Sequence, residues 1–429
     1  MRAEARKVAA RVLDRLADPE AAEADTGFPD GPAGEPVWHD LSLASGHPGV
    51  SLAFSGSTDR RPENVARAHA YLIRALAAVA AGGNPPAGLY GSTSAAAHAL
   101  LIAYRATGGY TSALAQLDAY HRDLIREALP QVPSDGPVEN NREYDVISGM
   151  TGIGRHLLAR GEPLLPELRA VLAYLVHMSK DDVPLRGHRV PRWWTWAAPR
   201  KGQEAALPDG HLNLSLSHGV CGPLALLSLS WQAGVHVPGH REAIESLMSL
   251  LETWAVPDGQ GIRWPQILTL ADWSAGTVAV PWHRPSWCYG TPGMTRAVHL
   301  AAIALDRTDW HDLAHRSLLP LLSRPVAEWG VTDAELCHGA SGLLHLFGLL
   351  APHIDDPRVP AARDDLAAMT LSMFDASHRF GYRTAATNAP LGADLPAFLD
   401  GAAGVALALD AYANDGVAGA GWDMTLLAN

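Results

Sequence analysis

The chain has 429 residues, of which 48% are hydrophobic and 18% are charged, a balance that excludes a disordered chain and predicts a folded protein with a large core. Its 33 basic and 45 acidic residues give a net charge of -12 without a basic run, which argues against nucleic-acid binding. Three cysteines are too few for a disulfide framework and fit a reducing compartment where thiolates can hold a metal.

The N-terminus is charged and leads into a helix-like stretch instead of an apolar secretory segment. Residues 1–40 are predicted to form a helix and a loop, with the loop at 17–36. The longest apolar runs, at 224–229 and 343–350, are shorter than the roughly 20 residues that span a bilayer. We therefore expect a soluble cytoplasmic protein without a membrane span.

A short glycine element, Gly-x-x-Gly or a remnant of it, recurs along the chain ahead of apolar runs. Its seven copies begin at Gly46, Gly91, Gly149, Gly219, Gly290, Gly339 and Gly401. The second copy has Ser94 in place of its closing glycine. The intervals of 45 to 71 residues are irregular, but each is long enough for two helices and their connections.

The runs that follow the glycines are predicted to be buried helices, because they are apolar on almost every face, as at 223–231 and 405–412. Amphipathic segments between them, such as 64–79 and 241–254, suit an outer layer. Seven inner helices inside seven outer ones predict an all-α fold, an α/α toroid or double α-barrel. No boundary marks a second domain, so residues 1–429 are expected to form one domain.

A loop is predicted at 183–210, ahead of the fourth glycine element. It carries Trp193, Trp194 and Trp196. These tryptophans either form a surface that contacts peptide or pin the loop to the core by burial. The sequence leaves both interpretations open.

Two glycine elements have cysteines just ahead of them: Cys288 before the fifth, and Cys337 with His338 before the sixth. Zinc prefers cysteine and histidine ligands, and a catalytic site takes three from the protein. Inner helices that run in one direction would gather these residues at one end of the barrel, so they predict a zinc site. Either cysteine alone would more readily be a small buried residue, but two at equivalent repeat positions beside a histidine favour the metal site. For Cys221, burial without a site role remains the expectation.

Other polar residues stand at similar helix starts. His218 precedes the fourth element and is a candidate general acid or base. Asp145 lies ahead of the third and could orient His218, although an aspartate in this position is more often an N-cap. Arg284 and Tyr289 flank Cys288, and the arginine fork could hold a carbonyl or enolate oxygen.

These sequence motifs resemble those of the lanthipeptide cyclases, the lanthionine synthetase C-like family. The residues that carry the resemblance are 284–293, 337–342, 213–219 and Asp145. The seven-copy layout extends it over nearly the whole chain. The resemblance implies an α/α toroid with Zn2+ held by Cys288, Cys337 and His338.

The resemblance also implies acid and base roles for His218 and Asp145, with Arg284 and Tyr289 lining the site. The reaction it implies is addition of peptide cysteine thiols to dehydroalanine or dehydrobutyrine, which forms lanthionine and methyllanthionine rings. The substrate would be a dehydrated precursor peptide of leader and core. Because the chain is no longer than one toroid, we expect a separate dehydratase to act first, and peripheral association with an export complex is left open.

Three rival classes remain. A zinc protein of the same fold that binds glutathione or peptide thiols without ring closure is the main alternative. An α/α-barrel glycosidase would need two opposed carboxylates, and Asp145 has no repeat-related partner. A zinc prenyltransferase also activates thiols, but it does not require the glycine series.

Overall fold

The computed structural model describes all residues except 24–37, 84, 86, 132–135, 200–201 and 387–388. The chain forms two compact units. The first consists of Met1–Ala119 and Pro325–Thr425, and the second of Tyr120–Arg324 and Leu426–Asn429. The single domain expected from the sequence stays a prediction.

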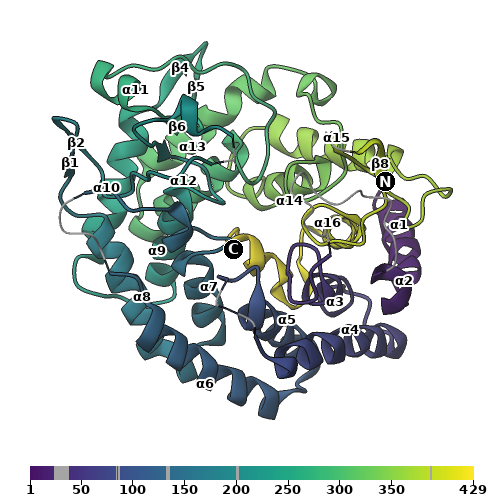
Figure 1. The fold of residues 1–429 in the computed structure, drawn as a ribbon. Coiled ribbons are helices and arrows are strands. Elements are labelled where there is room, and N and C mark those ends of the chain that lie inside the picture. Colours follow the sequence, from purple (N-terminus) through teal and green to yellow (C-terminus); the bar gives the residue numbers. More distant parts are fainter. Residues whose placement is uncertain (24–37, 84, 86, 132–135, 200–201, 387–388) are drawn as a thin grey trace. The chain divides into compact units, whose positions relative to one another are not determined.

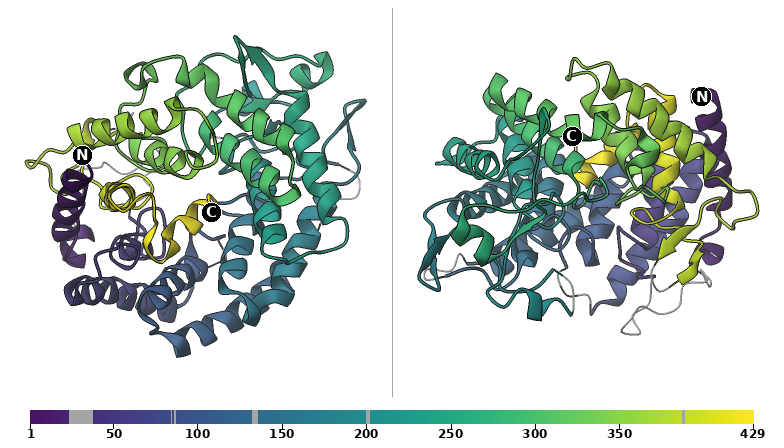
Figure 2. Two further views of the ribbon diagram at one scale, coloured as in Figure 1. Left: turned by 180° about the vertical axis from the view of Figure 1, so that it is seen from behind. Right: turned by 90° about the horizontal axis from the view of Figure 1, so that it is seen from above.

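The first unit pairs buried helices with amphipathic ones. Its helices are α1 (Arg2–Arg15), α2 (Pro19–Glu23), α3 (His47–Ser55), α4 (Pro62–Ala81), α5 (Ser92–Thr107), α14 (Ala340–Leu350), α15 (Arg358–Ser372) and α16 (Ala402–Ala413), and α6 (Thr111–Ala128) begins in it. Helix α3 packs on α4, α14 on α15, and α16 on α1, so the start of the chain supplies the partner of the last buried helix (Figure 1). The views in Figure 2 show the same α1–α16 pair.

The second unit repeats this pairing. Its helices are α7 (Met150–Arg160), α8 (Leu165–Met178), α9 (Cys221–Gln232), α10 (His240–Thr253), α11 (Leu270–Ala275), α12 (Thr291–Leu305) and α13 (Thr308–Leu322). Helix α7 packs on α8, α9 on α10 and α12 on α13, while α9 also packs on α12. Among the helices that the structure describes, none has both the length and the apolar character needed to cross a membrane.

The strands are short and pair in twos. They are β1 (Val183–Leu185) with β2 (His188–Val190), β3 (Leu212–Asn213) with β6 (Ile267–Leu268), β4 (Val256–Asp258) with β5 (Gly261–Arg263), and β7 (Thr384–Ala386) with β8 (Ala389–Ala393). All four pairs are antiparallel. They connect helices and add no layer of their own to the core.

Every glycine element predicted from the sequence stands at the start of a buried helix. The seven helices are α3, α5, α7, α9, α12, α14 and α16, and the first glycine is the N-cap of all except α9, which begins two residues after it. The predicted amphipathic segments are also confirmed, because α4 covers 64–79 and α10 covers 241–253. Each copy of the glycine element therefore marks the start of a buried helix.

The closing glycine of the element is required by close backbone packing. A Cβ on Gly342 would lie 1.9 Å from the carbonyl oxygen of Leu336, and one on Gly293 would lie 2.0 Å from that of Trp287. In both copies the contact is with the residue six places earlier, in the loop that leads into the helix. The glycine thus lets the loop fold back against the first turn of its own helix.

We predict that Gly342→Ala lowers the free energy of unfolding by about 1–3 kcal/mol, the usual cost of overpacking against atoms that cannot move away. Gly348, in the same helix, is the matched control, because a Cβ there meets nothing within 4 Å. Gly348→Ala should be neutral or stabilising by up to about 1 kcal/mol, since alanine is the better helix former. Urea unfolding of both variants tests this, and equal effects would contradict the packing argument.

Two predicted loops differ in part from the structure. Helix α2 occupies 19–23, inside the stretch expected to be irregular, while 24–36 lie outside the described residues. The segment 183–210 contains the β1–β2 hairpin, and its residues 200–201 are not described. Trp193 and Trp194 are 2% and 0% exposed, so burial of these two side chains pins the loop to the core, whereas Trp196 is 36% exposed and contact with peptide at this residue stays a prediction.

Candidate metal centre

The loops ahead of the buried helices are tied to one another by backbone hydrogen bonds. In the second unit the carbonyl of Cys288 accepts from the amides of Leu216 and Ser217, at 3.1 and 3.3 Å. In the first unit the carbonyl of Leu399 accepts from Leu336 and Cys337, both at 3.0 Å. Both acceptors stand two places before the first glycine of their element. These hydrogen bonds fix the backbones of the loops and therefore the positions from which the side chains extend.

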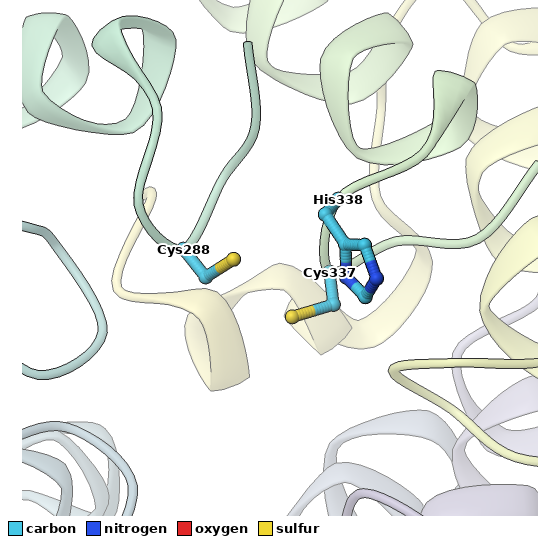
Figure 3. Close-up of side chains that lie close together, drawn as sticks. All are labelled: Cys288, Cys337 and His338. Atoms are coloured by element: carbon cyan, nitrogen blue, oxygen red, sulfur yellow. The ribbon is translucent and has the colours of Figure 1, made fainter. Parts of the chain in front are cut away.

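Cys288 lies in the second unit, on the loop that enters α12 (Figure 3). Its thiol is partly exposed and lies 3.6 Å from the hydroxyl of Ser286. The preceding residue, Trp287, is 1% exposed and donates from Nε1 to the carbonyl of Leu426 at 2.9 Å. A buried aromatic anchor thus fixes the backbone next to a thiol that remains accessible.

Cys337 and His338 lie in the first unit, on the loop that enters α14 (Figure 3). Their ligand atoms are within 4.8 Å of each other, and both side chains are partly exposed. Glu335 and Asp400 approach the same imidazole, with Glu335 2.7 Å from Nε2 and Asp400 3.9 Å from Nδ1. The first unit therefore offers a thiol and an imidazole on neighbouring residues, next to two carboxylates.

Tyr90 is a further neighbour of Cys337. It is 4% exposed, and its hydroxyl donates to the carbonyl of Thr425 at 2.7 Å. Burial raises the pKa of Tyr90 well above its ordinary value, and the negative charges that Cys337 and Asp400 can carry raise it further. The phenol is therefore neutral and adds no charge to this cluster.

The structure brings Asp145 and His218 together in the second unit. Asp145 is fully buried, and its Oδ2 lies 2.7 Å from Nδ1 of His218. Its Oδ1 accepts from the amides of Ser148 and Gly149, at 2.6 and 2.9 Å. The N-cap of α7 is Gly149, so the N-cap interpretation of Asp145 is wrong: one carboxylate oxygen holds the loop ahead of the helix, and the other orients His218.

Tyr289 lies beside this pair, with its ring 5.8 Å from that of His218. Its hydroxyl accepts a hydrogen bond from Nδ2 of Asn213 at 3.2 Å. Tyr289 and Arg284 both line a pocket of the second unit, together with Arg263 and other residues. Among the described residues that line it, none is acidic, although the whole chain carries a charge of -12. The pocket is thus suited to an oxygen atom with partial or full negative charge.

Sequence reasoning missed two residues that the structure puts next to the candidates. Asn213 is fully buried, and its Oδ1 also accepts from the amide of Ser215 at 2.9 Å, so it fixes both a loop and the Tyr289 hydroxyl. Glu335 stands three residues before His338, but a glutamate in a loop gave no signal of its own. Cys221 is fully buried and burial raises the pKa of its thiol, which agrees with the expectation that it has no site role.

Comparisons with known proteins agree with the sequence motifs described above and with the fold. A family model described as lanthionine synthetase C-like protein matches residues 37–427. Nisin biosynthesis protein NisC from Lactococcus lactis subsp. lactis is 22% identical over 315 residues, which cover 72% of this chain and 73% of that protein. The solved structure of a nisin cyclase covers 99% of this chain and 96% of its own, with 19% identity and a TM-score of 0.76. The structural match confirms the predicted all-α fold class, that of the α/α toroids.

Proposed function

The chain belongs to the lanthionine synthetase C-like protein family, and from this premise we propose that it is a zinc-dependent lanthipeptide cyclase. It adds cysteine thiols of a dehydrated precursor peptide to dehydroalanine or dehydrobutyrine of the same peptide. The observation that carries the proposal is the buried Asp145 held 2.7 Å from His218, an acid–base couple beside Tyr289 and on a loop whose Ser217 amide donates to the carbonyl of Cys288. A protein that merely bound thiols would not need this couple.

Cys288, Cys337 and His338 would hold the zinc ion as its three protein ligands. Three features support this set: the two cysteines stand two places before the first glycine of their elements, the donors are those zinc prefers, and a buried carboxylate lies behind the imidazole. A bound zinc would lower the pKa of an incoming substrate thiol, which is ordinarily about 8.5. Two protein thiolates and a neutral imidazole cancel the metal's charge, so a substrate thiolate would keep its donor strength.

In the reaction, the substrate sulfur forms a bond to the β-carbon of the dehydro residue. The electron pair of the carbon–carbon double bond moves to the α-carbon and its carbonyl as an enolate, and the α-carbon then takes up a proton. His218 is placed to deliver this proton, because Asp145 on its Nδ1 stabilises the protonated ring and leaves Nε2 to face the substrate. The thiol proton released at the start balances the one taken up.

Arg284 and Tyr289 would stabilise the oxygen on which the enolate charge develops. The guanidinium and the phenol line one pocket, and the described residues that line it include no acidic side chain. Donors arranged in advance around a developing charge are effective in catalysis. Asn213 fixes the Tyr289 hydroxyl and thereby the orientation of its proton. The cytoplasmic location, the separate dehydratase and the export complex stay predictions.

The decisive assay follows free thiols. The purified, zinc-loaded protein is incubated with a dehydrated peptide that contains cysteine, and the mixture is alkylated and analysed by mass. Ring closure leaves the peptide mass unchanged but removes a thiol that can be alkylated. A parallel incubation without protein measures spontaneous closure.

Faster loss of alkylation than in the protein-free sample supports the cyclase. If every cysteine is labelled as in that control while the protein retains glutathione or the peptide, the non-cyclising alternative is correct.

A further inference from the structure

A buried carboxylate without a well-aligned hydrogen bond lies behind His338. Glu335 is 2% exposed, and neither of its side-chain oxygens receives a hydrogen bond of good geometry from the residues that the structure describes. Its Oε1 lies 2.7 Å from Nε2 of His338. A carboxylate removed from water requires a proton donor or a cation beside it, and this imidazole is in place to be that partner.

The two nitrogens of the His338 ring have different neighbours. Nε2 faces the buried Glu335, whereas Nδ1 is 3.9 Å from Oδ1 of Asp400, whose side chain is 42% exposed. That second distance is too long for a hydrogen bond. A neutral imidazole has one N–H and one lone pair, so a carboxylate in contact with Nε2 favours the proton there and leaves the lone pair on Nδ1.

The loop holds Glu335 in this position. The amides of Ala340 and Ser341 donate back to the carbonyls of Asp333 and Ala334, at 2.8 and 3.1 Å. A Cβ on Gly339 would lie 2.5 Å from the backbone nitrogen of Glu335. The turn into α14 therefore packs tightly around Glu335.

We propose that Glu335 is the positioning residue of the zinc ligand His338, holding its Nε2 proton so that Nδ1 is the nitrogen that binds the metal. The inference rests on the proposed zinc site. Such outer carboxylates fix the ring orientation of a ligating histidine and increase its basicity. Here the added negative charge also opposes loss of electron density from the sulfur ligands, which favours a nucleophilic substrate thiolate.

The test measures zinc affinity by competition with a chromophoric chelator. Glu335→Ala should weaken zinc binding roughly 10- to 100-fold, the usual effect of removing such a partner. Glu335→Gln keeps the shape and one acceptor oxygen but loses the charge, and should show a smaller loss. Asp400→Asn is the matched control on the other nitrogen and should leave the affinity nearly unchanged.

Nitrogen assignment in the zinc-loaded wild type gives a second readout that no folding defect can affect. Long-range proton–nitrogen correlation spectra distinguish metal on Nδ1 from metal on Nε2. Zinc on Nε2, or Glu335→Ala with wild-type affinity, would overturn the inference while leaving the cyclase intact. A wild-type protein that binds no zinc would instead contradict the proposed function.

Discussion

Replacing Cys337 by alanine is expected to abolish tight zinc binding, and Cys288→Ala should do the same. Each change removes one of two thiolates from a proposed set of three protein ligands, and thiolates are the donors that hold zinc most strongly. We expect affinity to fall by at least about two orders of magnitude, more than the loss caused by removing an outer partner. Elemental analysis after dialysis and chelator competition measure the result.

Cys221→Ala is the matched control, because this third cysteine is fully buried in α9. It should retain one zinc per chain and lose only some stability. If Cys337→Ala loses zinc but Cys288→Ala retains it, Cys288 is not a zinc ligand.

The helix starts could be predicted from the sequence because their signal is local. A closing glycine such as Gly342 is required wherever the loop before a helix packs against the first turn of that helix. The packing constraint is therefore visible in the sequence as a glycine at a fixed position of the repeat. Cys288, Cys337 and His338 stand just ahead of copies of the same repeat, so their placement at helix starts could also be predicted. His218 and Asp145 could be paired in advance for that reason, although the 2.7 Å contact itself required the structure.

The roles of Glu335 and Asn213 could not be predicted, because they depend on how the loops fold back in space. Such folding leaves no repeated pattern in the sequence. Glu335 becomes a neighbour of His338 through the tight turn at Gly339, and Asn213 reaches Tyr289 from 76 residues away. The hairpin inside 183–210 and the short α2 were missed for a related reason. These elements are stabilised by contacts with other segments, and their own composition resembles that of loops.

Replacing His218 by alanine is expected to abolish cyclisation while leaving zinc in place. The substitution removes the proposed proton donor but touches none of the proposed ligands, so the rate of thiol loss should fall roughly 100- to 10,000-fold, the usual contribution of a general acid or base. Loss of both zinc and activity in this variant would show that His218 supports the metal site instead. The thiol-alkylation assay and zinc analysis on one preparation separate these outcomes.

Asp145→Asn tests whether the aspartate acts through His218. The amide can retain the Oδ1 acceptor used by Ser148 and Gly149, so the loop should stay folded, but it presents an NH2 group to the imidazole and disfavours the protonated ring. Cyclisation should therefore slow markedly in the single variant. Because residues that act as one unit are not additive, the double variant should be no slower than His218→Ala alone. A further loss in the double variant would assign Asp145 a role independent of the histidine.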